Sequence, residues 1–258
     1  MLTDELRKIV DNIKYTEIPN PLLNEFLDRL GLQKILLFFG GLKLRKLSAK
    51  CRSIDDCLNL VASFHFKLFY RTSYVILRSM QRRSEIRKFS KIFAKIRPKT
   101  VLEIGTAEGG TLFLLTRLSD PNALILSISF SRKRTFREIF YHSFAMYNQK
   151  LFFLERDSHK LSTLEELKKI LKNRQIDVLF IDGDHSYEGV KKDFEMYGPL
   201  VKKKGIIAFH DIVKVSPDFA PDVEVNKFWN EIKENYEYKE LVEDWNQEWG
   251  GIGVITMK

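Results

Sequence analysis

Two short apolar runs, each followed by acidic residues and histidine, most constrain how this chain can fold. The first run, residues 178–181, is followed by residues 182–185 (DGDH), and the second run, residues 206–209, is followed by residues 210–211 (HD). Short apolar runs bounded by turn residues are typical of strands that are buried on both faces of a parallel sheet. Such sheets bind ligands outside the carboxyl ends of their strands, so we expect the chemistry of this protein at these two ends.

A helix is expected at residues 84–96, and from residue 100 to the end of the chain patterns typical of strands and helices alternate. The expected strands lie at residues 101–104, 123–128, 151–154, 178–181, 206–209, 238–242 and 252–257. The expected helices lie at residues 84–96, 111–118, 132–148, 162–173 and 223–235, with a further helix after residue 185. Ser162 and Glu165 form a capping box that would open the helix at 162–173. This alternation predicts an α/β fold with a doubly wound, mostly parallel sheet.

The first 80 residues show helical periodicity without this alternation. The pattern runs through residues 6–13 and 20–30, and it returns as a long stretch over residues 57–80. Ser53 and Asp56 resemble a capping box that would open this last stretch. Aromatic side chains are frequent in it, and they suit either helix packing or stacking on nucleic-acid bases.

Positive charge is concentrated in the first hundred residues, which carry 21 Lys and Arg against 9 Asp and Glu, while the whole chain has a net charge of +9. A basic flank is typical of proteins that bind nucleic acid, an anionic surface or an acidic substrate, but also of solvated helix faces. We predict a basic, helical N-terminal extension (residues 1–80) and a main domain (residues 81–258). The extension would serve as a lid, a docking arm or the contact surface of a homo-oligomer.

Composition places the chain among soluble globular proteins, with 44% hydrophobic and 30% charged residues. No apolar run reaches the length of a transmembrane segment. Acidic residues stand near the N-terminus, where a signal peptide is basic and then apolar, so we expect a cytoplasmic protein. The two cysteines, Cys51 and Cys57, fit a reducing compartment better than a disulfide framework.

A glycine-rich turn follows the expected strand at residues 101–104. It contains Glu103, Gly105, Gly109 and Gly110 and leads into a helix. Glycines at such a turn let a ligand approach the backbone, and the helix N-terminus offers free N–H groups. The turn lacks the spacings of phosphate binders, and its acidic residue suits a ligand that carries an ammonium or sulfonium group. A tight turn without a ligand is the alternative.

Three segments of the chain resemble known methyltransferases. Residues 101–111 (VLEIGTAEGGT) resemble the first motif of class I S-adenosylmethionine-dependent methyltransferases. Residues 176–212 resemble the family that includes the cephalosporin-hydroxylase-like and macrolide-sugar O-methyltransferase proteins, and residues 251–258 (GIGVITMK) resemble the last strand of that fold. The resemblance covers residues 81–258 and implies a Rossmann-like, seven-stranded sheet whose last strand is antiparallel.

The resemblance also implies where the cofactor, S-adenosylmethionine, would bind. The methionine part would lie against the glycine-rich turn, at Glu103, Gly105, Thr106, Gly109 and Gly110. The family places an acidic residue that binds the ribose hydroxyls where this chain has Ser129, which can form one hydroxyl bond in place of a bidentate carboxylate contact. Asp157 and Ser158 match the pair that meets the adenine amino group, with a helix N-cap as the alternative role.

Methyl transfer to a hydroxyl requires activation of that hydroxyl, by a metal ion or by a general base, because an alcohol is barely ionised at neutral pH. In the resembling metal-dependent O-methyltransferases, the positions of Asp182, His210 and Asp211 bind Mg²⁺. Imidazole suits zinc or iron better than Mg²⁺, so His210 departs from the family pattern, and Asp184 could supply the missing oxygen. We expect His185 to be the general base, since its unperturbed pKa is about 6.5, and Asp182 to be the second catalytic residue.

From these residues we predict a metal-binding, S-adenosylmethionine-dependent O-methyltransferase that acts on a small molecule, such as a sugar or a glycosylated metabolite. An RNA or DNA methyltransferase is one alternative, which the basic flank favours and the missing amine-methylating signature opposes. A binding or scaffold protein that kept the fold without catalysis is another, favoured by Ser129. Structural roles also stay open, with Asp184 and Ser186 capping a helix and His210 bonded to Asp211.

Overall fold

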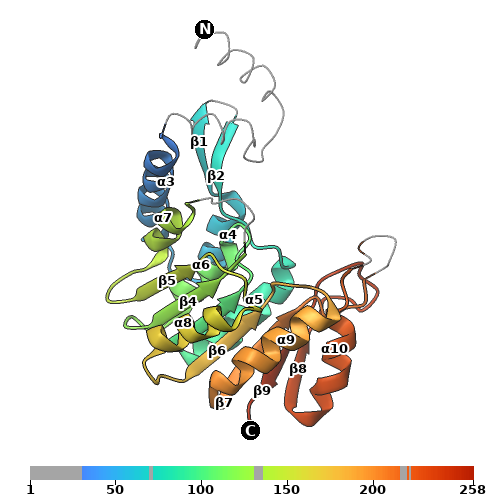
Figure 1. The fold of residues 1–258 in the computed structure, drawn as a ribbon. Helices are drawn as coiled ribbons and strands as arrows, with labels where there is room; N and C mark the ends of the chain where they lie inside the picture. The colour runs from blue at the N-terminus through green and yellow to red at the C-terminus, as the bar shows by residue number, and fades with distance from the viewer. Residues whose placement is uncertain (1–30, 70–71, 131–135, 216–219, 221) are drawn as a thin grey trace.

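A seven-stranded, mostly parallel sheet forms the centre of the protein, as predicted (Figure 1). The computed structural model describes residues 31–69, 72–130, 136–215, 220 and 222–258. The strands of this sheet are β3 (Thr100–Ile104), β4 (Leu124–Ile128), β5 (Lys150–Leu154), β6 (Ile176–Ile181), β7 (Val201–His210), β8 (Glu237–Leu241) and β9 (Ile252–Thr256). Their order is β5-β4-β3-β6-β7-β9-β8, and β9 runs antiparallel to both of its neighbours. The expected antiparallel last strand is therefore confirmed.

The strand order reverses in the middle of the sheet, at β3 and β6. From β3 the chain proceeds outward to β4 and β5, and it then returns to the other side of β3 for β6 and β7. The register aligns Ile104, the last residue of β3, with Ile128 of β4 and Ile181 of β6. The loops that leave β3 and β6 diverge at this edge, which is where doubly wound sheets bind their ligands.

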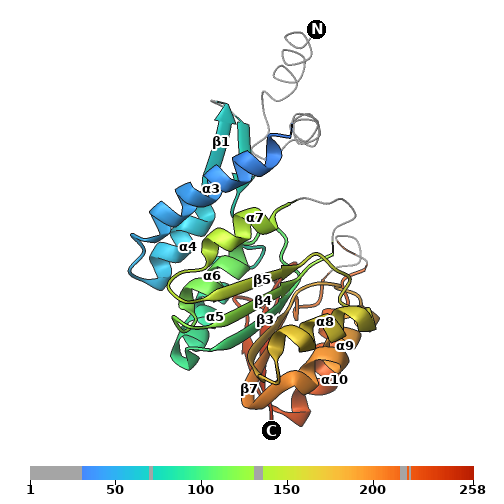
Figure 2. The ribbon, with the colours of Figure 1, turned by 60° about the vertical axis from the view of Figure 1, so that its left-hand side comes forward.

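Helices cover both faces of the sheet (Figure 2). One face carries α4 (Ile54–Ser63), α5 (Arg83–Ile96) and α6 (Gly110–Leu118), and the other carries α8 (Leu161–Leu171), α9 (Tyr187–Tyr197) and α10 (Val225–Ile232). Successive strand residues point to opposite faces, so Val101 joins the core beneath α5 and α6 while Leu102 joins the core beneath α8 to α10. Strands covered on both faces are apolar throughout, and this is why the short runs in the sequence predicted them.

Within the described residues, the part of the chain before α5 contains two helices and a hairpin. Helix α3 (Gln33–Ser48) precedes α4, and Ser53 opens α4 with the predicted capping box to Asp56. The predicted helix over residues 57–80 is wrong beyond Ser63, because β1 (His65–Phe69) and β2 (Thr72–Ile76) pair as an antiparallel hairpin. Aromatic and β-branched residues are frequent here, and such residues favour strands over helices. The predicted helical segments before residue 31 lie outside the described residues.

Two helix predictions in the main domain need correction. Of the helix predicted at 132–148, the structure describes only α7 (Glu138–Tyr141) and the short 3₁₀ helix η1 (His142–Phe144), and residues 131–135 lie outside the described part. The capping box at Ser162 is wrong, because α8 starts at Leu161 and its N-cap residue, Lys160, makes no side-chain cap bond. The helix predicted at 223–235 ends as expected, because α10 continues into the 3₁₀ helix η3 (Lys233–Asn235).

None of the helices in the described part of the chain combines the length and the apolar composition needed to cross a membrane.

Candidate active site

A cavity of about 500 Å³ opens at the carboxyl edge of the sheet, beside the strand-order reversal. Its walls come from the ends of β3, β4, β5 and β6. Seven of the predicted site residues line it: Gly105, Thr106, Ser129, Asp157, Ser158, Asp182 and His185. The fold therefore brings residues from four separate segments of the sequence to one cavity. Glu103, Gly109, Gly110, His210 and Asp211 do not line it.

Tight backbone packing explains the glycines of the turn after β3. Gly105 has φ +87°, and a Cβ added there would lie 1.9 Å from the backbone oxygen of Asp182. Only glycine therefore allows the ends of β3 and β6 to come this close. A Cβ on Gly109 would meet the ring of Tyr141, and a Cβ on Gly110 would meet the backbone of Arg78 at 2.2 Å. Cofactor binding by Gly109 and Gly110 stays a prediction.

Glu103 lies fully buried in β3 and is linked to the cavity residue Thr106 through the hydroxyl of Ser127. Its Oε2 accepts a hydrogen bond from the Ser127 hydroxyl, which also bonds to the Thr106 hydroxyl. The other oxygen, Oε1, has no partner within the described part of the chain. Burial raises the pKa of Glu103 to about 8. Burial therefore favours the neutral form of Glu103 near pH 7, and a cationic ligand nearby would favour its ionised form.

The predicted ribose and adenine residues lie on the cavity wall. Ser129 follows β4 directly, and its hydroxyl lies 3.4 Å from the backbone nitrogen of Thr106, which donates to it. Asp157 accepts a hydrogen bond from the backbone of His159 at 2.9 Å, so it orders the turn ahead of α8 without being the N-cap residue. The backbone oxygen of Ser158 accepts from the Tyr197 hydroxyl.

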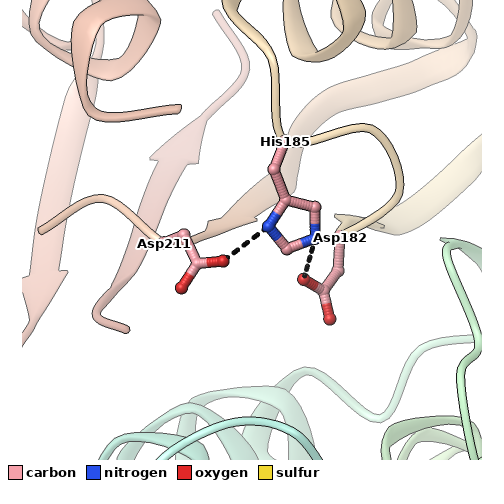
Figure 3. A group of neighbouring side chains, drawn as sticks. All are labelled: Asp182, His185 and Asp211. Atoms are coloured by element: carbon pink, nitrogen blue, oxygen red, sulfur yellow. Dashed lines mark ion pairs between the residues drawn. The ribbon is translucent and has the colours of Figure 1, made fainter. Parts of the chain in front are cut away.

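Asp182, His185 and Asp211 form a compact group at the ends of β6 and β7 (Figure 3). Asp211 Oδ2 lies 2.7 Å from His185 Nδ1, and Asp182 Oδ1 lies 3.7 Å from His185 Nε2. The imidazole thus sits between two carboxylates, with about a third of its side chain exposed. The hydrogen bond to Asp211 raises the pKa of His185, against the effect of burial.

His210 is buried behind this group, and its Nδ1 contacts both acids. It lies 2.9 Å from Asp182 Oδ1 and 3.3 Å from Asp211 Oδ2. Burial disfavours its charged form, but the two carboxylates outweigh burial and raise the pKa of His210 to about 10. Hydrogen bonds from His185 and His210 likewise outweigh burial at Asp211, whose pKa lies well below its usual range. The raised pKa favours a protonated His210 between the two acids, and a protonated imidazole cannot coordinate a metal.

Asp182, His185 and Asp211 are the described residues whose ligand atoms lie close enough together to hold a divalent cation. Ligand atoms of Asp182, His185 and Asp211 all lie within 4.8 Å of one another. Asp182 and Asp211 come together as predicted, with His185 beside them, and metal binding by His210 stays a prediction. Ser186 is the N-cap of α9, so the capping alternative is confirmed for Ser186. Asp184 accepts a hydrogen bond from the backbone of Ser186 in the turn before the helix and also lines the cavity.

One residue of the site was missed by sequence reasoning. Gln81 Nε2 donates a hydrogen bond to Asp182 Oδ2 at 2.7 Å, from a position 101 residues away in the chain. A single glutamine at the start of a helical pattern carries no signal of such a contact. The contact between Gln81 and Asp182 depends on the fold, because the segment before α5 packs across the start of α6.

Part of the chain is similar to a known protein family and to a curated protein. Residues 102–212 match the model of a family described as a methyltransferase domain. An uncharacterized protein of Acanthamoeba polyphaga mimivirus is 31% identical over 134 residues, which are 48% of this chain and 57% of that protein. The matched region therefore spans little more than half the length of this curated relative.

Solved structures share the fold. A candidate caffeoyl-CoA O-methyltransferase of Staphylococcus aureus aligns with a TM-score of 0.53 and 19% identity, over 82% of this chain and 95% of that one. An O-methyltransferase of Bacillus cereus in complex with SAH aligns with a TM-score of 0.50 and 16% identity, over the same shares of the two chains. The chain therefore shares the fold of these O-methyltransferases, and its residues 102–212 match the model of a methyltransferase domain.

Proposed function

We propose that this protein transfers a methyl group from S-adenosylmethionine to a hydroxyl group of a small molecule. The observation that carries the proposal is the Asp211–His185 pair, whose imidazole lines the same cavity as Gly105, Thr106 and Ser129. A base beside a cofactor cavity is what methylation of an alcohol requires, because the alcohol must lose its proton as the methyl group arrives.

His185 would act as the general base. Nδ1 bonds to Asp211 at 2.7 Å, which fixes the tautomer and leaves the Nε2 lone pair available to an acceptor hydroxyl. Asp211 stabilises the imidazolium that forms when Nε2 takes the proton. Asp182, with Oδ1 at 3.7 Å from Nε2, adds a second negative charge that favours this protonated state. The three side chains together supply both the base and the charge that stabilises its product.

The cavity residues fit S-adenosylmethionine, which supplies an electrophilic methyl group on a sulfonium. Gly105 and Thr106 would lie against its methionine part, with Glu103 behind them, and Ser129 would meet the ribose. Asp157 and Ser158 would meet the adenine. The buried Glu103 oxygen that lacks a partner in the described part of the chain supports a cationic ligand at this position.

A divalent cation is the second way in which this site could activate a hydroxyl. Asp182, His185 and Asp211 would hold it, and it would lower the pKa of the acceptor hydroxyl. A ligand set of two carboxylate oxygens and one imidazole nitrogen suits Mn²⁺, Fe²⁺ or Zn²⁺. These ions are alternatives to the Mg²⁺ that the resemblance implies. A metal bound to His185 would leave that residue unable to act as the base, so the two routes exclude each other.

A transfer assay tests the proposal. We expect S-adenosylhomocysteine to form when the protein, S-adenosylmethionine and a hydroxylated acceptor are combined, using a panel of sugars, glycosides and phenols. Matched arms contain the corresponding amines, or RNA. A product only with amines or RNA would contradict the proposal. Parallel reactions with EDTA, with and without added Mg²⁺ or Mn²⁺, separate the two routes, because only the metal route loses activity to the chelator.

A further inference from the structure

We propose that Gln81 is a positioning residue that fixes the carboxylate of Asp182 for methyl transfer, an inference that rests on the proposed function. Its side-chain Nε2 donates to Asp182 Oδ2 at 2.7 Å. Gln81 is only 6% exposed, so water does not compete freely for this bond. A hydrogen bond to a charged acceptor in such a setting is among the stronger kinds found in proteins.

Two hydroxyl groups set the orientation of the Gln81 amide. Its Oε1 accepts hydrogen bonds from the hydroxyls of Ser79 and Thr111, each at 2.5 Å. In the flipped orientation, the amide oxygen would face the carboxylate of Asp182, which only accepts hydrogen bonds, whereas the two hydroxyls can either donate or accept. The network therefore selects the orientation in which Nε2 points at Asp182.

The backbone that carries Gln81 is held against the start of α6. The backbone nitrogen of Gly110 donates to the oxygen of Arg78 at 2.9 Å, and the two segments touch so closely that Gly110 has no room for a Cβ. The 78–81 segment thus cannot drift away from the sheet edge without breaking this contact. The backbone position from which the Gln81 side chain contacts Asp182 is therefore fixed by packing against α6.

With Gln81 in place, both oxygens of Asp182 are bonded. His210 Nδ1 holds Oδ1 at 2.9 Å and Gln81 holds Oδ2. Rotation of the carboxylate would break both bonds, so Oδ1 keeps its position 3.7 Å from His185 Nε2. Without the Gln81 amide, Oδ2 would be free to turn toward the cavity, and the charge that Asp182 presents to His185 would no longer be fixed.

The test replaces Gln81 with methionine, which has a similar shape and cannot donate a hydrogen bond. We expect kcat to fall by about 10- to 100-fold, as loss of a hydrogen bond to a charged group implies, with KM for S-adenosylmethionine unchanged. Gln81→Glu should lose more, because it places a second carboxylate against Asp182. The matched control is Gln149→Met, which removes a half-buried amide bonded to the backbone oxygens of Thr116 and Asp120, and which should change stability and leave kcat unchanged.

Wild-type kcat in Gln81→Met would overturn the inference, since it would show that Gln81 only fills space. Failure of the proposed function is a separate outcome, in which the wild-type protein methylates no acceptor at all. Crystal structures of the wild type and of Gln81→Met then test the inference without any assay. A rotated Asp182 carboxylate in the variant supports it, and an unchanged carboxylate overturns it.

Discussion

Replacing His185 with asparagine should lower kcat for methyl transfer by about 10²- to 10⁴-fold, the range that general-base catalysis contributes. The Nδ2 of asparagine lies close to the place of the imidazole Nδ1, so the variant keeps a donor to Asp211 while losing the nitrogen that accepts the proton. Binding of S-adenosylmethionine should persist, because the residues expected to hold it belong to other segments of the cavity wall. Initial rates of S-adenosylhomocysteine formation, together with calorimetric titration of the cofactor, separate these two effects.

The matched control is His142→Asn, at an exposed histidine in η1 that plays no part in the site. It should show wild-type kcat and cofactor affinity. A His185→Asn variant whose kcat stays within a few-fold of the wild type would remove His185 from the mechanism, and would leave Asp182 or another group as the base.

Replacing Gly105 with alanine should destabilise the protein by about 3–5 kcal/mol, the range of a severe core or backbone change. Two costs add at this position. The residue has φ +87°, which alanine tolerates poorly, and the new Cβ would lie 1.9 Å from the backbone oxygen of Asp182. Because backbone cannot move aside as a flexible side chain does, the ends of β3 and β6 must separate. Denaturant unfolding gives the change in the free energy of unfolding.

Gly31 provides the comparison that separates these two costs. It also has a positive φ, +68°, but a Cβ there would meet nothing within 4 Å. Gly31→Ala should therefore cost only about 1–2 kcal/mol, the penalty for the left-handed conformation alone. Equal losses of stability in the two variants would show that the contact between β3 and β6 is looser than described here.

The sheet and its site edge could be predicted from the sequence because the signals are local. Strands buried on both faces are continuous apolar runs, and the residues that follow them must lie at one edge of a parallel sheet. Asp182, His185 and Asp211 could be expected together on this ground alone. The glycine-rich turn could be expected as well, although the structure explains Gly109 and Gly110 by their contacts with Tyr141 and Arg78.

The rest depends on contacts that sequence patterns do not carry. Residues 65–69 and 72–76 have the spacing of a helix but form the paired strands β1 and β2, because their residue types favour strands. The placement of both His185 and His210 around Asp182 and Asp211 also depends on the fold, and no spacing in the sequence predicts it. Gln81 reaches Asp182 across 101 residues, and no spacing within the chain predicts that contact.

The division of the chain near residue 81 and the role of the basic N-terminal extension stay proposals. The contacts of the 78–81 segment with α6 and Asp182 place this boundary at the site itself. The N-terminal extension would therefore connect directly to Gln81, which contacts Asp182. This would hold whether the extension acts as a lid or as the contact surface of a homo-oligomer.

Calorimetric titration with S-adenosylmethionine tests the central claim most directly, because it needs no knowledge of the acceptor. We expect saturable binding at one site per chain, competed by S-adenosylhomocysteine. Binding should be lost in Ser129→Trp, which fills the cavity, and kept in Ser63→Trp, a control at an exposed position at the end of α4. Absence of binding to the wild-type protein at millimolar cofactor, or unchanged binding in Ser129→Trp, would contradict the account.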